Sequence, residues 1–187
     1  MKVVLFNGSP REHGCTYTAV RLVADELERE GITTEIIHAA KEGFSARDVD
    51  EAASRCLESD GIVLSSPVWY ASACGLSSYF YDQLFNRIGY RMRLKAGACV
   101  VSCRRGGATA TFDQLNKYFT ISGITVVSSF YWNQVHGNTP DEVLRDEEGV
   151  ATMRELGRNM AYVLKALDRA ALPLPESGPR VKTNFIR

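Results

Sequence analysis

Apolar and polar residues follow two distinct patterns along the chain. Short runs of apolar and β-branched residues, typical of strands buried on both faces of a sheet, occupy residues 2–6, 33–38, 61–66, 97–103 and 124–127. Between these runs, apolar residues recur every three or four positions, which indicates amphipathic helices. The helical segments span residues 16–30, 46–59, 76–88, 109–121 and 150–167. The pattern therefore predicts five strands that alternate with five helices.

Cap residues support two of these helix limits. Gly31 stands where a C-terminal cap belongs, and Ser45 precedes the second helix as an N-terminal cap. Regular alternation of strand and helix predicts an α/β fold with helices on both faces of a parallel sheet. Five strands fit the doubly wound, flavodoxin-like order 2-1-3-4-5. We see no internal repeat and expect residues 1–171 to form one domain.

The composition changes after residue 171. Residues 172–187 read LPLPESGPRVKTNFIR and form a Pro-rich C-terminal tail. One interpretation is a solvated end with polyproline character. The other is an arm whose Phe185 and Ile186 dock on the body or on a neighbouring subunit. The sequence leaves both interpretations open.

Charge and length exclude several classes of protein. The 187 residues contain 22 Lys plus Arg and 22 Asp plus Glu, so we expect no nucleic acid partner and no anionic membrane surface. No apolar run approaches a membrane span, and the chain begins with a charged residue and a strand rather than a signal sequence. We therefore expect a cytoplasmic location.

The cysteines are scattered along the chain and include no C-x2-C pair: Cys15, Cys56, Cys74, Cys99 and Cys103. An odd number of dispersed cysteines favours reduced thiols over a disulfide framework. The same spacing argues against a metal or iron-sulfur cluster, so we expect no metal site.

The first strand runs directly into the loop NGSPREHGCTYT, residues 7–18, ahead of the first helix. Glycines, hydroxyls and Arg11 at a helix N-terminus provide N–H groups, O–H groups and a cation for an anionic ligand. The glycine offsets of the P-loop and of the dinucleotide fingerprint are both absent. Cys15-x5-Arg21 has phosphatase spacing, but Cys15 lies far past the strand and Arg21 falls within the helix. We therefore predict a site for a phosphorylated cofactor.

Two further strand ends carry polar and aromatic residues. In a doubly wound sheet, ligands lie beyond the carboxyl ends of the strands at the switch point, here between strands one and three. Residues 66–75 follow strand three, where Pro67 frees backbone amides and Trp69 or Tyr70 can pack on a flat ring. Residues 102–107 follow strand four with two arginines and two glycines. Each feature alone also fits core aromatics or a solvated turn, but together they favour a flavin site.

A set of residues in these segments resembles a known family: Gly8-Ser9-Pro10-Arg11, Gly14, Thr16, Pro67-Val68-Trp69-Tyr70, Gly75, Phe80 and Asp82. The set is similar to that of the NADPH-dependent FMN reductases and multimeric flavodoxins, and residues 131–140 resemble a subgroup of these oxidoreductases. The resemblance implies noncovalent FMN, NADPH or NADH as the electron donor, and a homodimer or homotetramer. Residues 1–171 would then be a flavodoxin-like FMN-binding domain.

The resemblance also implies which residues bind FMN. Ser9, Arg11, Cys15, Thr16 and Tyr17 would hold the phosphate; Pro67, Val68, Trp69 and Tyr70 would border the isoalloxazine ring; Arg105, Gly106 and Gly107 would border its far edge. Cys15, Ser78 and Gln83 depart from the residues usual in the family. The iron-sulfur relatives carry a compact cysteine cluster that this chain lacks, so we expect the chain to lie outside that branch.

These features predict an FMN-dependent NAD(P)H oxidoreductase that reduces a small acceptor such as a quinone, a nitro compound or a flavin. No side chain need be essential, because the flavin supplies the reactivity. The alternatives are a non-enzymatic FMN electron carrier and the Cys15 phosphatase. His136, in a long loop over residues 129–149, is either a proton donor or a structural turn residue. The broad apolar face of residues 76–88 suggests a subunit interface.

Overall fold

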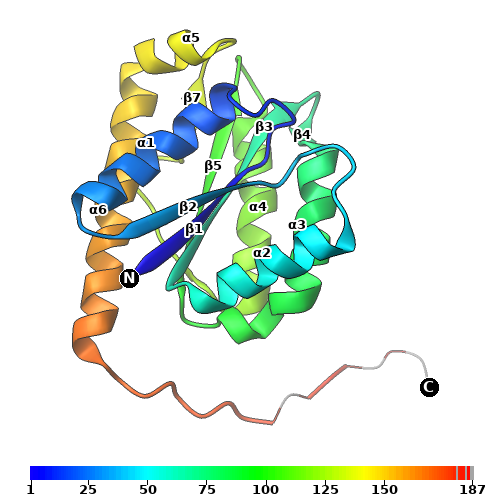
Figure 1. Ribbon diagram of the computed structural model, residues 1–187, viewed down its shortest axis with the longest axis vertical. Helices are drawn as coiled ribbons and strands as arrows, with labels where there is room; N and C mark the ends of the chain where they lie inside the picture. The colour runs from blue at the N-terminus through cyan, green and yellow to red at the C-terminus, as the bar shows by residue number, and fades with distance from the viewer. Residues whose placement is uncertain (180, 184, 186–187) are drawn as a thin grey trace.

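The computed structural model describes residues 1–179, 181–183 and 185. A sheet lies at the centre, with helices on both of its faces (Figure 1). The strands are β1 (Lys2–Asn7), β2 (Thr33–His38), β3 (Gly61–Trp69), β4 (Ser72–Ala73), β5 (Ala96–Cys103), β6 (Thr125–Val126) and β7 (Gln134–His136). The helices are α1 (Cys15–Arg29), α2 (Ala46–Glu58), α3 (Gly75–Ile88), the 3-10 helix η1 (Gly89–Met92), α4 (Ala108–Ser122), α5 (Pro140–Arg145) and α6 (Glu147–Ala170).

The sheet has the order β2-β1-β3-β5-β6, and these strands are parallel. Because β4 is a two-residue hairpin partner of β3, this order is the predicted 2-1-3-4-5 arrangement of the five main strands. The α/β, flavodoxin-like doubly wound fold is therefore confirmed. The switch point lies between β1 and β3, where the chain direction across the sheet reverses.

The fifth strand differs from the prediction because it is split. β6 pairs with the start of β5 and β7 pairs with its end, while residues 127–133 connect the two. The sequence pattern of residues 124–127 identified the first half only. The second half was missed because it has three residues, Gln134 to His136, and pairs with β5 rather than with a sequence neighbour.

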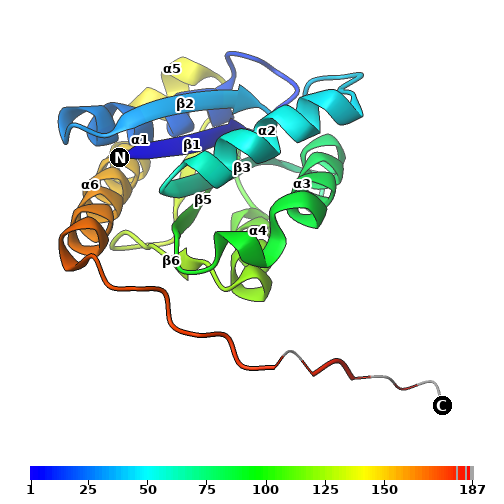
Figure 2. The ribbon, with the colours of Figure 1, turned by 60° about the horizontal axis from the view of Figure 1, so that its bottom comes forward.

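Two apolar cores lie on opposite faces of the sheet, and their composition differs. The core under α1 and α6 is aliphatic, with residues such as Val23, Leu27 and Leu156. The core under α2, α3 and α4 contains Phe6 and Phe80 among its several aromatic rings. Figure 2 shows these two helical layers on either side of the strands.

The chain leaves the domain after α6. Described residues beyond Ala171 form neither helix nor strand and run away from the body (Figure 1). The carbonyl of Pro175 accepts a hydrogen bond from Arg93, which holds this point of the tail against the domain. The predicted docking residue Ile186 lies outside the described residues. No helix in the described part of the chain is long and apolar enough to cross a membrane.

Candidate functional site

A cleft opens at the carboxyl ends of β1, β3 and β5, beside the switch point. Its walls come from four segments that are distant in sequence: the loop after β1, the β3–β4 hairpin, the end of β5 and the loop after β7. The lining residues are Ser9, Pro10, Arg11, Cys15, Thr16, Pro67, Val68, Trp69, Ser102, Cys103, Arg104, Gly137 and Asn138.

The loop after β1 is shaped by the buried side chain of Asn7. Its Nδ2 donates to the carbonyls of Arg11 at 3.3 Å and Glu12 at 2.9 Å, and its Oδ1 accepts from the Ser9 N–H at 3.2 Å. One amide therefore closes a turn of six residues. This leaves the side chains of Ser9 and Arg11 at the cleft.

Gly8 lies against the neighbouring strand with no room for a side chain. A Cβ atom at this position would stand 1.8 Å from the backbone oxygen of Ser65. The Gly8 N–H donates to Ser65 Oγ at 3.1 Å, and the buried Tyr81 hydroxyl donates to the Ser65 carbonyl at 2.7 Å. The glycine of the loop is thus required by close packing of β1 on β3.

The helix N-termini fall into two groups, those capped by a side chain and those without such a cap. The helices that follow the three central strands, α1, α3 and α4, have no side-chain cap and no acidic residue in the first turn. In contrast, α2, α5 and α6 are capped by Ser45, Thr139 and Asp146. The first N–H groups of a helix lack intrahelical partners, so the uncapped α1, which begins at the cleft, is suited to an anion.

Two side chains at the start of α1 connect it to other cleft segments. Thr16 Oγ1 and Ser102 Oγ lie 2.8 Å apart and are buried, so the hydroxyls of α1 and β5 share one hydrogen bond. Cys15 Sγ donates to the Gly137 carbonyl at 3.6 Å. Burial has the largest effect on the pKa of the Cys15 thiol and raises it, while a backbone hydrogen bond and Arg11 offset only part of this effect.

This geometry argues against the phosphatase. A phosphatase nucleophile needs a lowered thiol pKa, whereas the pKa of Cys15 is raised. Arg21 pairs with Asp25 at 2.6 Å and Glu28 at 2.5 Å on α1. The arginine of the Cys-x5-Arg spacing is therefore engaged elsewhere and does not line the cleft.

The β3–β4 hairpin forms the wall opposite α1. Ser66 Oγ accepts from the Cys74 N–H at 2.8 Å, which fixes the two ends of the hairpin. At its tip, Tyr70 has a φ of 59°, and the Ala71 N–H donates to the Trp69 carbonyl at 2.7 Å. A bulky residue in this tight turn is strained. Trp69 lines the cleft with 52% of its surface exposed.

Seven of the twelve residues implied by the family resemblance come together at the cleft: Ser9, Arg11, Cys15, Thr16, Pro67, Val68 and Trp69. The other five lie around it. Tyr17 packs edge-on against His13 at 4.9 Å, and Tyr70 projects into solvent. Arg105 and Gly106 are exposed beyond β5. Gly107 has a φ of 92°, and a Cβ there would approach Val68 Cγ1 to 2.8 Å, so Gly107 packs closely against the cleft residue Val68.

Four other lining residues, Pro10, Ser102, Cys103 and Arg104, lie in the two segments that the sequence analysis assigned to the site, although the resemblance did not name them as FMN contacts; Gly137 and Asn138 were not assigned to the site. Ser102 to Arg104 were detectable as a strand end, and their polar character was the available signal. Gly137 and Asn138 reach the cleft only because β7 pairs with β5. Neighbouring His136 is held by Asp146, which accepts from the His136 N–H at 2.6 Å and caps α6.

Comparisons with known proteins agree with this architecture. A profile of the NADPH-dependent FMN reductase family matches residues 1–139. RosB with its bound intermediate 8-demethyl-8-formylriboflavin-5'-phosphate has a TM-score of 0.75 at 12% identity, over 100% of this chain and 96% of RosB. The apo NADH:FMN oxidoreductase EMOB has a TM-score of 0.67 at 20% identity, over 88% of this chain and 89% of EMOB. At these identities the two structures establish the fold alone.

An iron-sulfur flavoprotein from Methanocaldococcus jannaschii is 31% identical over 193 residues, which covers 90% of this chain and all of the relative. The expectation that the chain stands apart from the iron-sulfur branch is therefore wrong as a statement of relationship. The five cysteines are free, and the described residues hold no group of three or more His, Cys, Asp or Glu suited to a metal ion. The similarity of this chain to an iron-sulfur flavoprotein therefore does not by itself imply an iron-sulfur cluster in this chain. The family match shows that the chain belongs to the NADPH-dependent FMN reductase family and is an FMN-dependent oxidoreductase.

Proposed function

We propose that this oxidoreductase takes a hydride from NADPH or NADH and passes the electrons to a small acceptor such as a quinone, a nitro compound or a free flavin. One observation carries the proposal. The cleft joins an uncapped helix N-terminus with Arg11 at one end and a half-exposed Trp69 at the other. An anionic group and a flat ring can therefore bind in one site that stays open to small molecules.

At the phosphate end, the proposed contacts come from α1 and the loop before it. Arg11 and the free N–H groups of α1 supply positive charge and donors for the FMN phosphate. Ser9 and Thr16 add hydroxyls, and the Thr16–Ser102 pair fixes one of them. Asn7 holds the loop in this form before the ligand arrives, which lowers the entropic cost of binding.

At the ring end, Pro67, Val68 and Trp69 provide an apolar wall with backbone amides along it. When bound, FMN supplies the chemistry, because its ring accepts a hydride from the nicotinamide and releases two electrons to the acceptor. Arg104 at the cleft favours negative charge on the ring by electrostatic stabilisation. The protein thus orients the two substrates against one exposed face.

The test begins with anaerobic visible spectra of the protein saturated with FMN, before and after addition of NADPH or NADH. Bleaching of bound flavin by either nucleotide is the expected result and ranks the donors. Bound flavin that stays oxidised would favour the non-enzymatic electron carrier. Failure to bind FMN would refute the assignment of the cleft.

Two variants on one helix test the phosphate contacts. Thr16→Ala removes a cleft hydroxyl and leaves Ser102 without its partner, so we expect the FMN dissociation constant to rise about tenfold. Thr18→Ala is the matched control, because Thr18 bonds to the Gly14 carbonyl and does not line the cleft. Equal effects of the two variants would contradict the assignment.

His136→Ala should leave flavin reduction by the nucleotide intact.

A further inference from the structure

A second hollow, remote from the cleft, lies on the outer side of α3, η1 and α4. It has a volume of about 720 Å³ and shares no residue with the cleft. We call it the aromatic groove, and it is lined by Tyr79, Asp82, Gln83, Phe85, Asn86, Gly89, Tyr90, Tyr118, Ile121 and Ser122. Four of these residues are aromatic and one is aliphatic, and they lie on α3, η1 and α4: Tyr79, Phe85, Tyr90, Tyr118 and Ile121. One lining residue is a carboxylate, and the lining contains no Lys or Arg.

The groove is held in shape by contacts among its own lining residues and with the core. The Tyr118 hydroxyl donates to Asp82 Oδ1 at 2.5 Å and links α4 to α3. The Phe85 ring lies 5.0 Å from the Tyr118 ring and 6.5 Å from that of Phe119 in the core. Above these rings, Ile121 is 78% exposed. A rigid apolar surface of this kind is typical of an interaction site.

The C-terminal tail presents apolar side chains that the domain does not cover. Leu172, Leu174, Val181 and Phe185 are all mostly exposed, and Phe185 reaches 93%. Prolines at positions 173, 175 and 179 favour an extended polyproline conformation in the first half of the tail. The prolines therefore favour an extended conformation before any partner binds. Farther along the tail, the domain leaves the side chains of Val181 and Phe185 almost fully exposed.

The root of the tail is fixed close to the groove. Leu174 lines a hollow with Leu164 and Leu167, and the Pro175 carbonyl accepts from Arg93. The Arg93 guanidinium stands 5.6 Å from the centre of the Tyr90 ring, which borders the groove. From this anchor the last described residues continue away from the body in both views (Figure 1, Figure 2).

We infer that the tail of one copy of this chain binds the aromatic groove of a second copy, and that the exchange is reciprocal in a closed dimer. Polyproline segments bind grooves lined by aromatic side chains with little loss of conformational entropy. Charge agrees, because the distal tail carries Arg180, Lys182 and Arg187 in sequence and the groove carries Asp82. At about 3.1 Å per residue, the tail spans roughly 40 Å, enough to reach across an interface.

The test compares dimer dissociation constants by sedimentation equilibrium. Truncation after Ala171 and Ile121→Glu each remove one partner of the contact, so each should raise the constant at least about tenfold. Tyr162→Glu on α6 is the matched control, because Tyr162 is 75% exposed and lies outside the groove. It should leave the constant within about twofold. Circular dichroism and FMN retention should stay unchanged in all three variants, since the cleft is not involved.

A mixing experiment separates exchange between copies from docking of the tail on its own domain. The truncated chain has a groove but no tail, and Ile121→Glu has a tail but a blocked groove. We expect the two variants to form a heterodimer when mixed, more tightly than either associates alone. A wild-type monomer at all concentrations, or unchanged dimerisation in both variants, would overturn the inference. A chain that stays monomeric while its tail is still covered by its own groove would also overturn the inference, because the tail would then bind its own domain and not a second copy.

Discussion

The two helical layers that cover the sheet solve the same packing problem with different residues. Under α1 and α6, the described core contains aliphatic side chains and no aromatic ring. Under α2, α3 and α4, rings such as Phe6, Phe80 and Phe119 fill the space. Small aliphatic residues let helices approach closely, whereas rings hold them apart. On the aromatic side, the rings continue outward into the aromatic groove.

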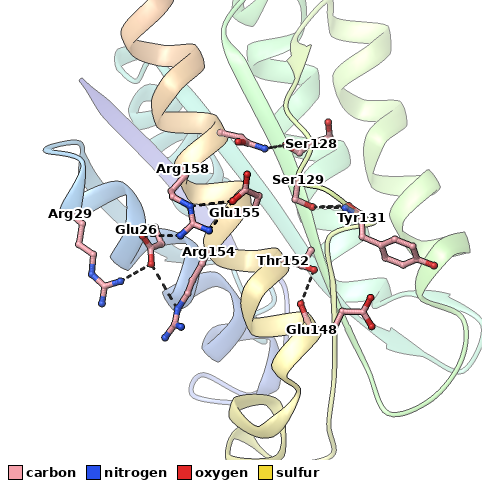
Figure 3. A network of polar contacts seen from close by, with 11 residues as sticks. Glu26, Arg29, Ser128, Ser129, Tyr131, Glu148, Thr152, Arg154, Glu155 and Arg158 are labelled. Carbon is pink, nitrogen blue, oxygen red and sulfur yellow. Dashed lines mark hydrogen bonds and ion pairs between the residues drawn. The ribbon is translucent and has the colours of Figure 1, made fainter.

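Charged residues seal the aliphatic layer from outside. Glu26 of α1 is almost buried and pairs with Arg29 at 2.6 Å, Arg158 at 3.7 Å and Arg154 at 3.8 Å (Figure 3). Gly157 of α6 lies directly against Glu26, where a Cβ would come within 2.6 Å of the Glu26 Cβ. This seam joins two helices that are far apart in sequence. The charged seam covers the contact between α1 and α6, whereas the outer faces of α3 and α4 present aromatic rings in the groove.

The largest effect is expected inside the aromatic layer. Phe80 is buried and contacts the rings of Phe44, Phe6 and Tyr81 at 5.1 to 6.2 Å. Phe80→Ala should lower the free energy of unfolding by about 3–5 kcal/mol, because it leaves a cavity. Urea denaturation gives this value. Tyr79→Ala, the exposed neighbour, should cost less than about 1 kcal/mol, and similar losses in both variants would show that the groove is part of the core.

The second prediction concerns the close approach of α1 and α6. Gly157→Ala forces the new methyl against Glu26 and the Val23 carbonyl, so the free energy of unfolding should fall by about 1–3 kcal/mol. Gly75→Ala at the start of α3 is the control, because nothing lies within 4 Å of its Cβ position. It should be neutral or stabilising by up to about 1 kcal/mol. Chemical denaturation of both variants measures the difference between the layers.

The third prediction tests the charged seam. Glu26→Gln removes the carboxylate shared by three arginines, and because those arginines are partly exposed the loss should be about 1 kcal/mol. Added salt should shrink the difference from wild type. Arg47→Gln breaks the exposed Arg47–Glu51 pair on α2 and should change stability by less than about 0.5 kcal/mol. A salt-independent loss in Glu26→Gln would point to packing rather than charge.

The smallest effect is a pH dependence in α2. Hydrogen bonds from the side chain and backbone of Ser45 lower the pKa of Asp48 below its usual value. Since the folded pKa lies below the unfolded one, this stabilisation is present above about pH 4 and disappears as the pH falls through the folded pKa. Melting curves of wild type and Asp48→Asn should differ at pH 7 and converge as the pH falls through the folded pKa of Asp48. A difference in melting temperature that persists at low pH would show that the substitution acts on the helix itself and not through the charge of the Asp48 carboxylate.

Local patterns predicted most of the elements correctly. The apolar runs located β1, β2, β3 and β5, and the helical periodicity located α1 to α4 within a few residues of their observed limits. Ser45 forms the predicted N-terminal cap with a capping box, and Thr139 caps α5. Short-range signals succeed here because caps and periodicity depend on residues within one or two turns.

Long-range contacts explain what was missed. The split of the fifth strand depends on pairing of β7 with β5, and residues 134–136 carry no local strand signal. The same pairing brings Gly137 and Asn138 to the cleft. Arg105 and Gly106 belong to a predicted strand end, yet they turn into solvent once β5 ends at Cys103.

The sequence by itself determined the α/β alternation, the family and the loop of residues 7–18, because these depend on local spacing and on residue identity. Tertiary structure decided that the loop after β7 joins the three predicted strand ends at the cleft, and which helical face carries the aromatic groove. Both are set by packing between segments separated by up to the length of the domain: Gly8 against Ser65, Thr16 against Ser102, and Gly157 against Glu26. No periodicity encodes such contacts, since each requires the shape of two surfaces at once.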